Sequence, residues 1–186
     1  MSNAKLEKSI EDVFKHYQES FSKKTYDDEN NVHDVLMKVF SITPELKREN
    51  RQYWGRELGM CWQLVVNEVF RQTRDDYTPP LRIGNDEPCD LTIGKIAIDT
   101  KYRVGSGDSG TLKKFKTYGH LLREEGYEPY FLILRRDNLK AAISAVEKGT
   151  WNTLIGMQTF EFIYENSGFD LYNYLIQKEG AYAVYR

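Results

Sequence analysis

The pattern of apolar and polar positions changes near residue 75 of the chain. Before that point, apolar residues recur every three or four positions, as on the buried face of an amphipathic helix. This spacing predicts helices over residues 5–23 and 32–40, and one or two more over 44–72. Thr43 fits the N-cap of the last segment, because Pro44 then occupies the first helical position. Residues 1–75 are therefore predicted to form a helical region packed on the rest of the chain.

After residue 75, strand-like and helical segments alternate. Residues 75–94 are rich in Pro, Gly and Asp, which is typical of loops, with room for a short strand at 81–83. Segments 95–104 and 129–136 predict strands, and the helical pattern of 111–125 between them is long enough for a parallel crossover. Helices are expected at 138–149, capped by Asn138, and at 170–178, whereas 160–164 fits either a strand or a helix. Residues 76–186 thus predict an α/β core with C-terminal helices, within one structural domain overall.

The strand at 95–104 carries charge on one side only. Strand alternation predicts one face with Ile96, Ile98, Thr100 and Tyr102, and an opposite face with Ala97, Asp99, Lys101 and Arg103. A carboxylate, an ammonium and a guanidinium would then follow one another at steps of about 7 Å. If residues 88–93 pair with 96–101, Asp90 folds back beside Asp99. Two neighbouring carboxylates repel unless a cation lies between them, and Mg²⁺ prefers such hard oxygen ligands.

A simpler reading needs no metal. Asp99 and Lys101 could form a surface ion pair on an edge strand, with Asp90 an ordinary turn residue. Same-face Asp and Lys neighbours are common in strands. The sequence pattern alone leaves both readings open.

The segment "CDLTIGKIAIDTK" resembles the PD-(D/E)xK nuclease signature, with Asp90 as the first acid and Asp99-Thr100-Lys101 as the second half. It departs from the signature at Cys89, where a proline is expected; Pro88 lies one position earlier. The resemblance implies a restriction-endonuclease-like core, in which helices flank a mixed central sheet. It also implies catalysis by Asp90, Asp99 and Lys101, with Mg²⁺ or Mn²⁺ held by both acids and the main-chain carbonyl of Thr100. Related nucleases often add a ligand from the preceding helix, for which Glu57 and Gln63 are both candidates.

The longer segment "DTKYRVGSGDSGTLKKFKTYGHLL" resembles type II restriction endonucleases, in particular the ApaLI-like family. This resemblance implies a cytoplasmic homodimer that hydrolyses double-stranded DNA at a short palindromic site. A cognate methyltransferase would belong to the same system without touching the nuclease. Two alternatives stay open: another PD-(D/E)xK nuclease, such as a junction resolvase or repair nuclease, and a non-catalytic DNA-binding module with this fold.

Charge is distributed unevenly along the chain. The formal net charge is −2, so no overall basic character indicates nucleic-acid binding. Residues 95–123, however, hold seven Lys or Arg against two Asp, a local net charge of +5. Any contact with a polyanion is therefore expected to be local. The candidate DNA-binding residues are Arg82, Arg103, Ser106, Ser109, Lys113, Lys114 and Lys116, although the lysines would equally suit a solvated helix surface.

The glycine loop "GSGDSG" at 105–110 matches the spacing of a dinucleotide-binding loop between a strand and a helix. The preceding strand is charged, however, whereas the first strand of a dinucleotide-binding fold is normally buried on both faces. We therefore expect no nucleotide cofactor, and a loop that approaches DNA phosphates with Asp108 or Ser109 capping the next helix. The start of the chain resembles no secretory signal, and no apolar run suits a membrane span. Cys61 and Cys89 lack CxxC spacing, so neither a disulfide nor structural zinc is expected.

Overall fold

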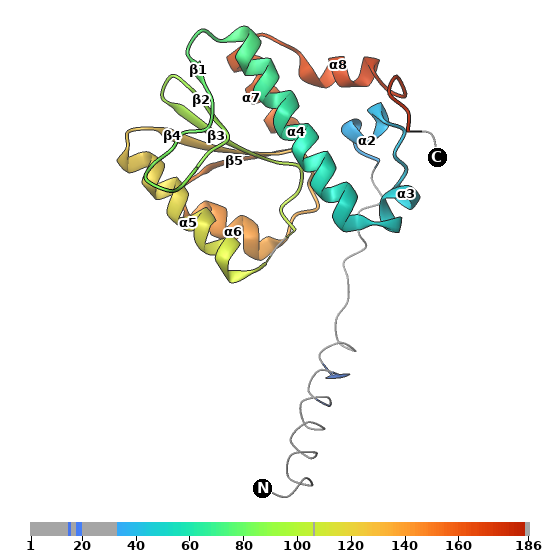
Figure 1. The fold of residues 1–186 in the computed structure, drawn as a ribbon, viewed down its shortest axis with the longest axis horizontal. Helices are drawn as coiled ribbons and strands as arrows, with labels where there is room; N and C mark the ends of the chain where they lie inside the picture. Colours follow the sequence, from blue (N-terminus) through green and yellow to red (C-terminus); the bar gives the residue numbers. More distant parts are fainter. Residues whose placement is uncertain (1–14, 16–17, 20–32, 106, 185–186) are drawn as a thin grey trace, which may run out of the picture. The chain divides into compact units, whose positions relative to one another are not determined.

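The computed structural model describes residues 15, 18–19, 33–105 and 107–184 (Figure 1). Contacts divide the chain into two units, Met1–Asn31 and Val32–Arg186. The described residues of the first unit are Lys15, Gln18 and Glu19, all helical, so the helix predicted at 5–23 lies largely outside the described residues. The fold below is that of the second unit.

A mixed five-stranded sheet forms the centre of this unit. Its strands follow chain order: β1 (Tyr77–Thr78), β2 (Leu91–Ile93), β3 (Ile96–Lys101), β4 (Glu128–Ile133) and β5 (Asn152–Ile155). The first three strands are antiparallel, whereas β3, β4 and β5 are parallel. The sheet confirms the α/β class and the hairpin that joins 88–93 to 96–101. The strand predicted at 81–83 is wrong, because this segment makes only a single bridge between Ile83 and Asp86.

The described residues of this unit form seven helices. They are α2 (Val35–Val39), α3 (Pro44–Glu49), α4 (Arg51–Thr73), α5 (Ser109–Glu124), α6 (Lys140–Lys148), α7 (Met157–Ser167) and α8 (Leu171–Gln177). Helices α4, α5, α6 and α7 contact the sheet, whereas α2, α3 and α8 pack beside it against α4 and α7. Thr43 caps α3 as predicted, accepting a hydrogen bond from the Leu46 amide at 3.2 Å. The segment 44–72 forms two helices because Asn50 leaves helical geometry and its side chain caps α4. The predicted cap of α6 is wrong: Leu139 is the N-cap, and the Asn138 side chain binds the Val104 amide instead.

Hydrophobic clusters cover both faces of the sheet. On one face, α4 presents the stripe Trp54, Leu58, Trp62, Val66 and Phe70, and α7 packs beside it. On the other face, α5 and α6 lie side by side over Phe131 and Trp151 (Figure 1). These two helices cross closely at glycines, because a Cβ on Gly119 would lie 1.9 Å from the carbonyl oxygen of Gly149. The sheet is therefore held rigidly from both sides.

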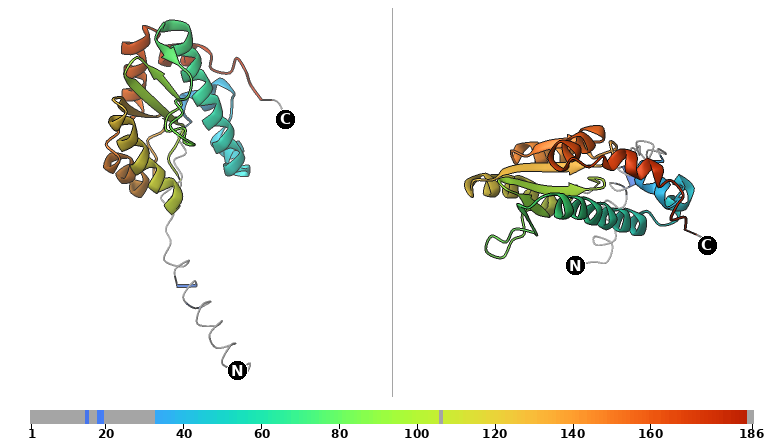
Figure 2. Two further views of the ribbon diagram at one scale, coloured as in Figure 1. Left: turned by 60° about the vertical axis from the view of Figure 1, so that its left-hand side comes forward. Right: turned by 90° about the horizontal axis from the view of Figure 1, so that it is seen from above.

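The connection between β1 and β2 projects from the body as a long loop (Figure 2). Within it, the Ile83–Asp86 bridge closes a tight turn, and the Tyr118 hydroxyl of α5 donates to the Asp86 carboxylate at 2.7 Å. The loop ends at Asp90, beside the last residues of β3. Within the described part of the chain, no helix combines the length and apolar character needed to cross a membrane.

Candidate metal-binding and catalytic site

The carboxylate of Asp90 is fully engaged by two neighbours. Asp90 directly precedes β2, whose register with β3 pairs Leu91 with Ile98. One carboxylate oxygen accepts hydrogen bonds from the main-chain amide and the hydroxyl of Thr100, both at 2.7 Å. The other accepts one from the Gln63 side-chain amide, also at 2.7 Å. These three bonds fix the orientation of the first predicted acid.

Lys101 lies between two oxygens of its own strand. Its ammonium donates to the Asp99 carboxylate and, at 3.1 Å, to the Thr100 carbonyl. It also lies 5.5 Å from the centre of the Phe131 ring, which is the register partner of Asp99 on β4. A positive charge therefore already sits against the carboxylate and the carbonyl that the nuclease resemblance assigns to a metal ion.

The Thr100 peptide connects the three predicted catalytic residues. Asp90 forms no direct hydrogen bond with Asp99 or Lys101; it binds the amide side of Thr100, and Lys101 binds the carbonyl side. Gln63 holds Asp90 from the α4 side of the sheet, whereas Lys101 lies over Phe131 on the α5 side. The groups thus surround one peptide unit at the C-terminal end of the central strand β3, and the Asp90 charge acts on both Asp99 and Lys101.

The charges of the three groups influence one another. The pKa of Asp99 is raised to about 7, mainly by burial; the Lys101 ammonium opposes the rise, and the Asp90 charge adds to it. Burial lowers the pKa of Lys101, but the Asp99 and Asp90 carboxylates outweigh burial, and the net direction is upward. Lys101 is therefore charged at neutral pH, and Asp99 is poised near the midpoint of its titration.

Cys89, which occupies the usual proline position, is buried beside the two acids. Burial raises the pKa of its thiol to about 12, and the charges of Asp99 and Asp90 act in the same direction. A thiolate is the reactive form of cysteine. Cys89 is therefore an inert packing residue at neutral pH, and not a nucleophile.

The oxygen atoms at this site suit a hard divalent cation. Asp90 and Asp99 supply carboxylate oxygens and Thr100 a main-chain carbonyl, which are ligand types that Mg²⁺ and Mn²⁺ accept. Of the two helix candidates, Gln63 touches Asp90, whereas Glu57 is exposed and pairs with Arg56 at 2.9 Å. Among the described residues, no three His, Cys, Asp or Glu side chains cluster in a metal-binding arrangement. A cation here would therefore depend on main-chain and amide oxygens as well as on carboxylates.

The predicted DNA-binding residues are spread over three segments. Arg82 pairs with Glu87 at 2.8 Å in the projecting loop, and with Lys114 and Tyr118 it lines a cavity of about 490 Å³. Lys113 and Lys116 are exposed on α5, and Ser109 is exposed at its first position. Asp108 caps that helix as predicted, accepting from the Thr111 amide at 2.9 Å. Ser106 lies outside the described residues.

Tyr118 was not predicted from the sequence. The pKa of its hydroxyl is raised to about 12. Burial contributes most, and the hydrogen bond to Asp86 and the charges of Asp86 and Asp99 act in the same direction. Tyr118 thus connects α5 to the projecting loop through Asp86. Its position in a helix with a lysine-rich surface gave no signal that separated it from an ordinary packing tyrosine.

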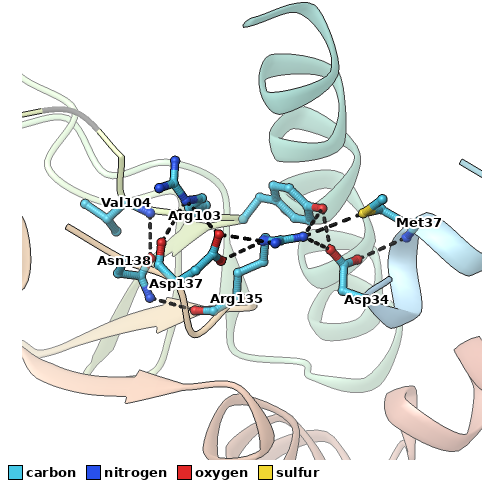
Figure 3. Close-up of polar contacts among 8 residues, drawn as sticks. Asp34, Met37, Arg103, Val104, Arg135, Asp137 and Asn138 are labelled. Carbon is cyan, nitrogen blue, oxygen red and sulfur yellow. Dashed lines mark hydrogen bonds and ion pairs between the residues drawn. The ribbon is translucent and has the colours of Figure 1, made fainter. Parts of the chain in front are cut away.

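A buried ionic cluster lies at the end of β3 and β4 (Figure 3). Arg135, whose side chain is 2% exposed, binds the carboxylates of Asp34 and Asp137 at 2.6 and 2.8 Å. Tyr102 donates to Asp34 from the same cluster. Asp137 also forms an ion pair with Arg103, so its carboxylate lies between the guanidinium groups of Arg103 and Arg135. Arg103 was predicted to continue the alternation of β3. The strand ends at Lys101, and the alternation holds as far as Tyr102, which packs with Ile98, but breaks beyond it, since Val104 packs in the same core as Ala97.

Comparisons with known proteins add no relatives. No protein-family model, curated protein or solved structure matches the chain.

Proposed function

We propose that the protein is a Mg²⁺-dependent endonuclease of the PD-(D/E)xK type that hydrolyses phosphodiester bonds in double-stranded DNA. The observation that supports this most is the arrangement around Thr100: its amide holds Asp90, while its carbonyl and Asp99 together hold the Lys101 ammonium. A simple surface ion pair would not bring a second, fully hydrogen-bonded carboxylate to the same peptide. The mixed sheet with helices on both faces also agrees with the core that the resemblance implies.

The oxygens of Asp90, Asp99 and Thr100 would hold the divalent cation, with Gln63 keeping Asp90 in place. When bound, a divalent cation supplies positive charge that stabilises the phosphate and the leaving oxygen and acidifies water. Binding would draw Asp99 fully into its ionised form, because a coordinating carboxylate must be deprotonated. Lys101 would then move from the Asp99–Thr100 oxygens toward the phosphate.

In that position, Lys101 orients the attacking water and balances the developing charge on phosphorus. The water oxygen attacks phosphorus in line with the leaving oxygen. The P–O3′ bond breaks, the attacking water loses a proton to the solvent and the leaving O3′ takes one up, so the products carry a 5′-phosphate and a 3′-hydroxyl. The charged state of Lys101 at neutral pH suits the stabilising role of this residue.

The finer assignment to site-specific type II restriction depends on the resemblance of residues 99–122 to the ApaLI-like family. Under this proposal the protein acts in the cytoplasm as a homodimer, since a two-fold symmetric protein matches a palindromic site. A cognate methyltransferase would protect the host sites. Junction resolvases and repair nucleases of the PD-(D/E)xK type use the same chemistry. Cleavage assays on different DNA substrates distinguish them from a restriction enzyme.

The test is digestion of long duplex DNA of known sequence with Mg²⁺, followed by mapping of the fragment ends. We expect discrete fragments with Mg²⁺ or Mn²⁺ and none with EDTA. Cleavage only of branched duplexes would instead assign the protein to junction resolution. Salt-sensitive DNA binding without any cleavage would indicate the non-catalytic module.

The matched variants are Lys101→Ala and Lys148→Ala. Lys101→Ala should lower the cleavage rate by a factor on the order of 10² to 10⁴, the range typical of a positioned proton-transfer or charge-stabilising group. Lys148, at the end of α6, controls for the loss of a lysine. Cleavage by Lys101→Ala at the rate of the unmodified protein would refute the assigned mechanism.

A further inference from the structure

Arg103 presents an unused guanidinium edge close to the candidate catalytic site. Its Nε atom donates to the Asp137 main-chain oxygen at 2.7 Å and lies 3.2 Å from the Asp137 carboxylate. Among the described residues, no hydrogen bond is donated by its Nη1 and Nη2 atoms. It lies two positions after Lys101 along the chain, a span of at most about 7 Å between Cα atoms.

The support behind Arg103 is unusually firm for a half-exposed arginine. Asp137 is shared between Arg103 and the buried Arg135, which in turn binds Asp34 at the start of α2 (Figure 3). The neighbouring Asn138 side chain binds the Val104 amide at 2.7 Å and donates to the Arg135 carbonyl at 2.6 Å. The backbone that carries Arg103 is thus fixed from both sides.

Gly105 leaves room for the free edge of the guanidinium. A Cβ at position 105 would lie 2.6 Å from Nη1 of Arg103 and 3.4 Å from its Cζ. The guanidinium therefore rests directly over the Gly105 backbone. Any larger residue at 105 would displace it without changing its charge.

We propose that Arg103 binds the DNA backbone at a phosphate next to the scissile one. A guanidinium edge with two free N–H-bearing nitrogens matches two phosphate oxygens, and a fixed arginine loses less side-chain entropy on binding. The chain Asp34–Arg135–Asp137 acts on DNA only through Arg103, so these three are positioning residues. This inference rests on the proposed function and adds to it a phosphate subsite separate from the metal ligands.

The test measures binding of the full-length protein to a duplex of mixed sequence, without divalent cation, over a series of salt concentrations. Arg103→Gln should weaken binding on the order of tenfold and should reduce the slope of log K against log salt by about 0.9, the value for one lost phosphate contact. Arg103→Lys should restore the slope but only part of the affinity, because an ammonium keeps the charge and loses the two-point geometry.

Gly105→Ala provides a second variant that keeps every charge. It should weaken binding severalfold, and Gly55→Ala, where a Cβ meets nothing within 4 Å, should not. Thermal unfolding of each variant separates misfolding from loss of the contact. Arg71→Gln on α4, whose partner is Glu68, controls for the loss of one arginine charge.

The outcomes separate this inference from the function that it extends. Full affinity and an unchanged salt slope in Arg103→Gln, with cleavage still dependent on Lys101, would refute the phosphate subsite and leave the nuclease proposal standing. Loss of affinity in Arg103→Gln in a protein that cleaves nothing would support a phosphate contact at Arg103 and count against the nuclease. An unmodified protein that binds no duplex at low salt would refute both.

Discussion

Asp90 accepts two hydrogen bonds from Thr100, one from its main-chain amide and one from its hydroxyl, each 2.7 Å long. The residues are ten positions apart and meet because the β2–β3 hairpin folds one strand back on the other. Thr100 therefore contributes more to the candidate site than its main-chain carbonyl. Its side chain fixes Asp90.

Removing the Thr100 hydroxyl should loosen Asp90 and lower stability. Thr100→Val keeps the side-chain shape but leaves a partly buried carboxylate with one bond fewer, at a cost of about 1–3 kcal/mol. Thr100→Ser retains the hydroxyl and should lose less. Urea unfolding at pH 7 measures both. Equal stability of the Val variant and the unmodified protein would show that the hydroxyl bond contributes nothing.

Asp99 predicts a specific dependence of stability on pH. Burial, with help from Asp90, raises its folded-state pKa to about 7 from an ordinary value of 3.8, so between these values the folded state binds a proton that the unfolded state lacks. Stability from this group is thus present at low pH and falls as pH rises toward 7. Relative to Asp99→Asn, the unmodified protein should lose roughly 2 kcal/mol between pH 5 and pH 7.5. Urea unfolding at both pH values measures this difference, and an opposite sign would mean that Lys101 dominates Asp99.

The buried Arg135 should be essential for folding. Replacing it with Met leaves Asp34 and Asp137 without their shared cation, which typically costs about 3–5 kcal/mol. Arg82→Gln is the comparison, because the Arg82–Glu87 pair is exposed and such pairs contribute about 0–1 kcal/mol. Similar midpoints of urea unfolding for the two variants would contradict the role given to the cluster.

The close crossing of α5 and α6 gives a prediction that is independent of function. Gly119→Ala would place a methyl group 1.9 Å from the Gly149 carbonyl oxygen and 2.7 Å from the Trp151 ring, so the helices must separate. We expect a loss of about 1–3 kcal/mol or more. Gly55→Ala, in an open position of α4, should instead be neutral or stabilise by up to about 1 kcal/mol. Thermal unfolding of both proteins checks the contrast.

The β2–β3 hairpin, which brings Asp90 beside the Asp99–Lys101 segment, could be predicted because it depends on local rules. Twelve consecutive residues form one hairpin, and strand alternation together with a tight turn nearly determines their arrangement. The caps at Thr43 and Asp108 are local in the same sense. The strand β5 was not predicted, since Asn152–Ile155 is short and only half-buried along its length.

The remaining parts of the site depend on contacts between distant segments. Gln63 reaches Asp90 across 27 positions, Asp86 meets Tyr118 across 32, and Arg135 reaches Asp34 across 101. Helix periodicity placed Gln63 and Glu57 on polar sides of α4 but could not say which side meets the sheet edge. Asn138 was predicted as a helix cap because asparagine favours N-cap positions. Its side chain instead accepts a hydrogen bond from the main-chain amide of Val104, just beyond the end of β3.

The central claim is that Asp90, Asp99 and the Thr100 carbonyl bind one divalent cation per chain. The most direct measurement is titration of the full-length protein with Mn²⁺, followed by the electron paramagnetic resonance signal of the free ion, with Mg²⁺ as competitor. We expect one Mn²⁺ site that Mg²⁺ displaces, and affinity at least about tenfold weaker in Asp90→Asn and in Asp99→Asn, since each loses a charged oxygen ligand. Glu57→Gln, on the exposed side of α4, should bind as the unmodified protein does. Mn²⁺ binding that is absent, or that survives both acid substitutions unchanged in folded protein, would contradict the account.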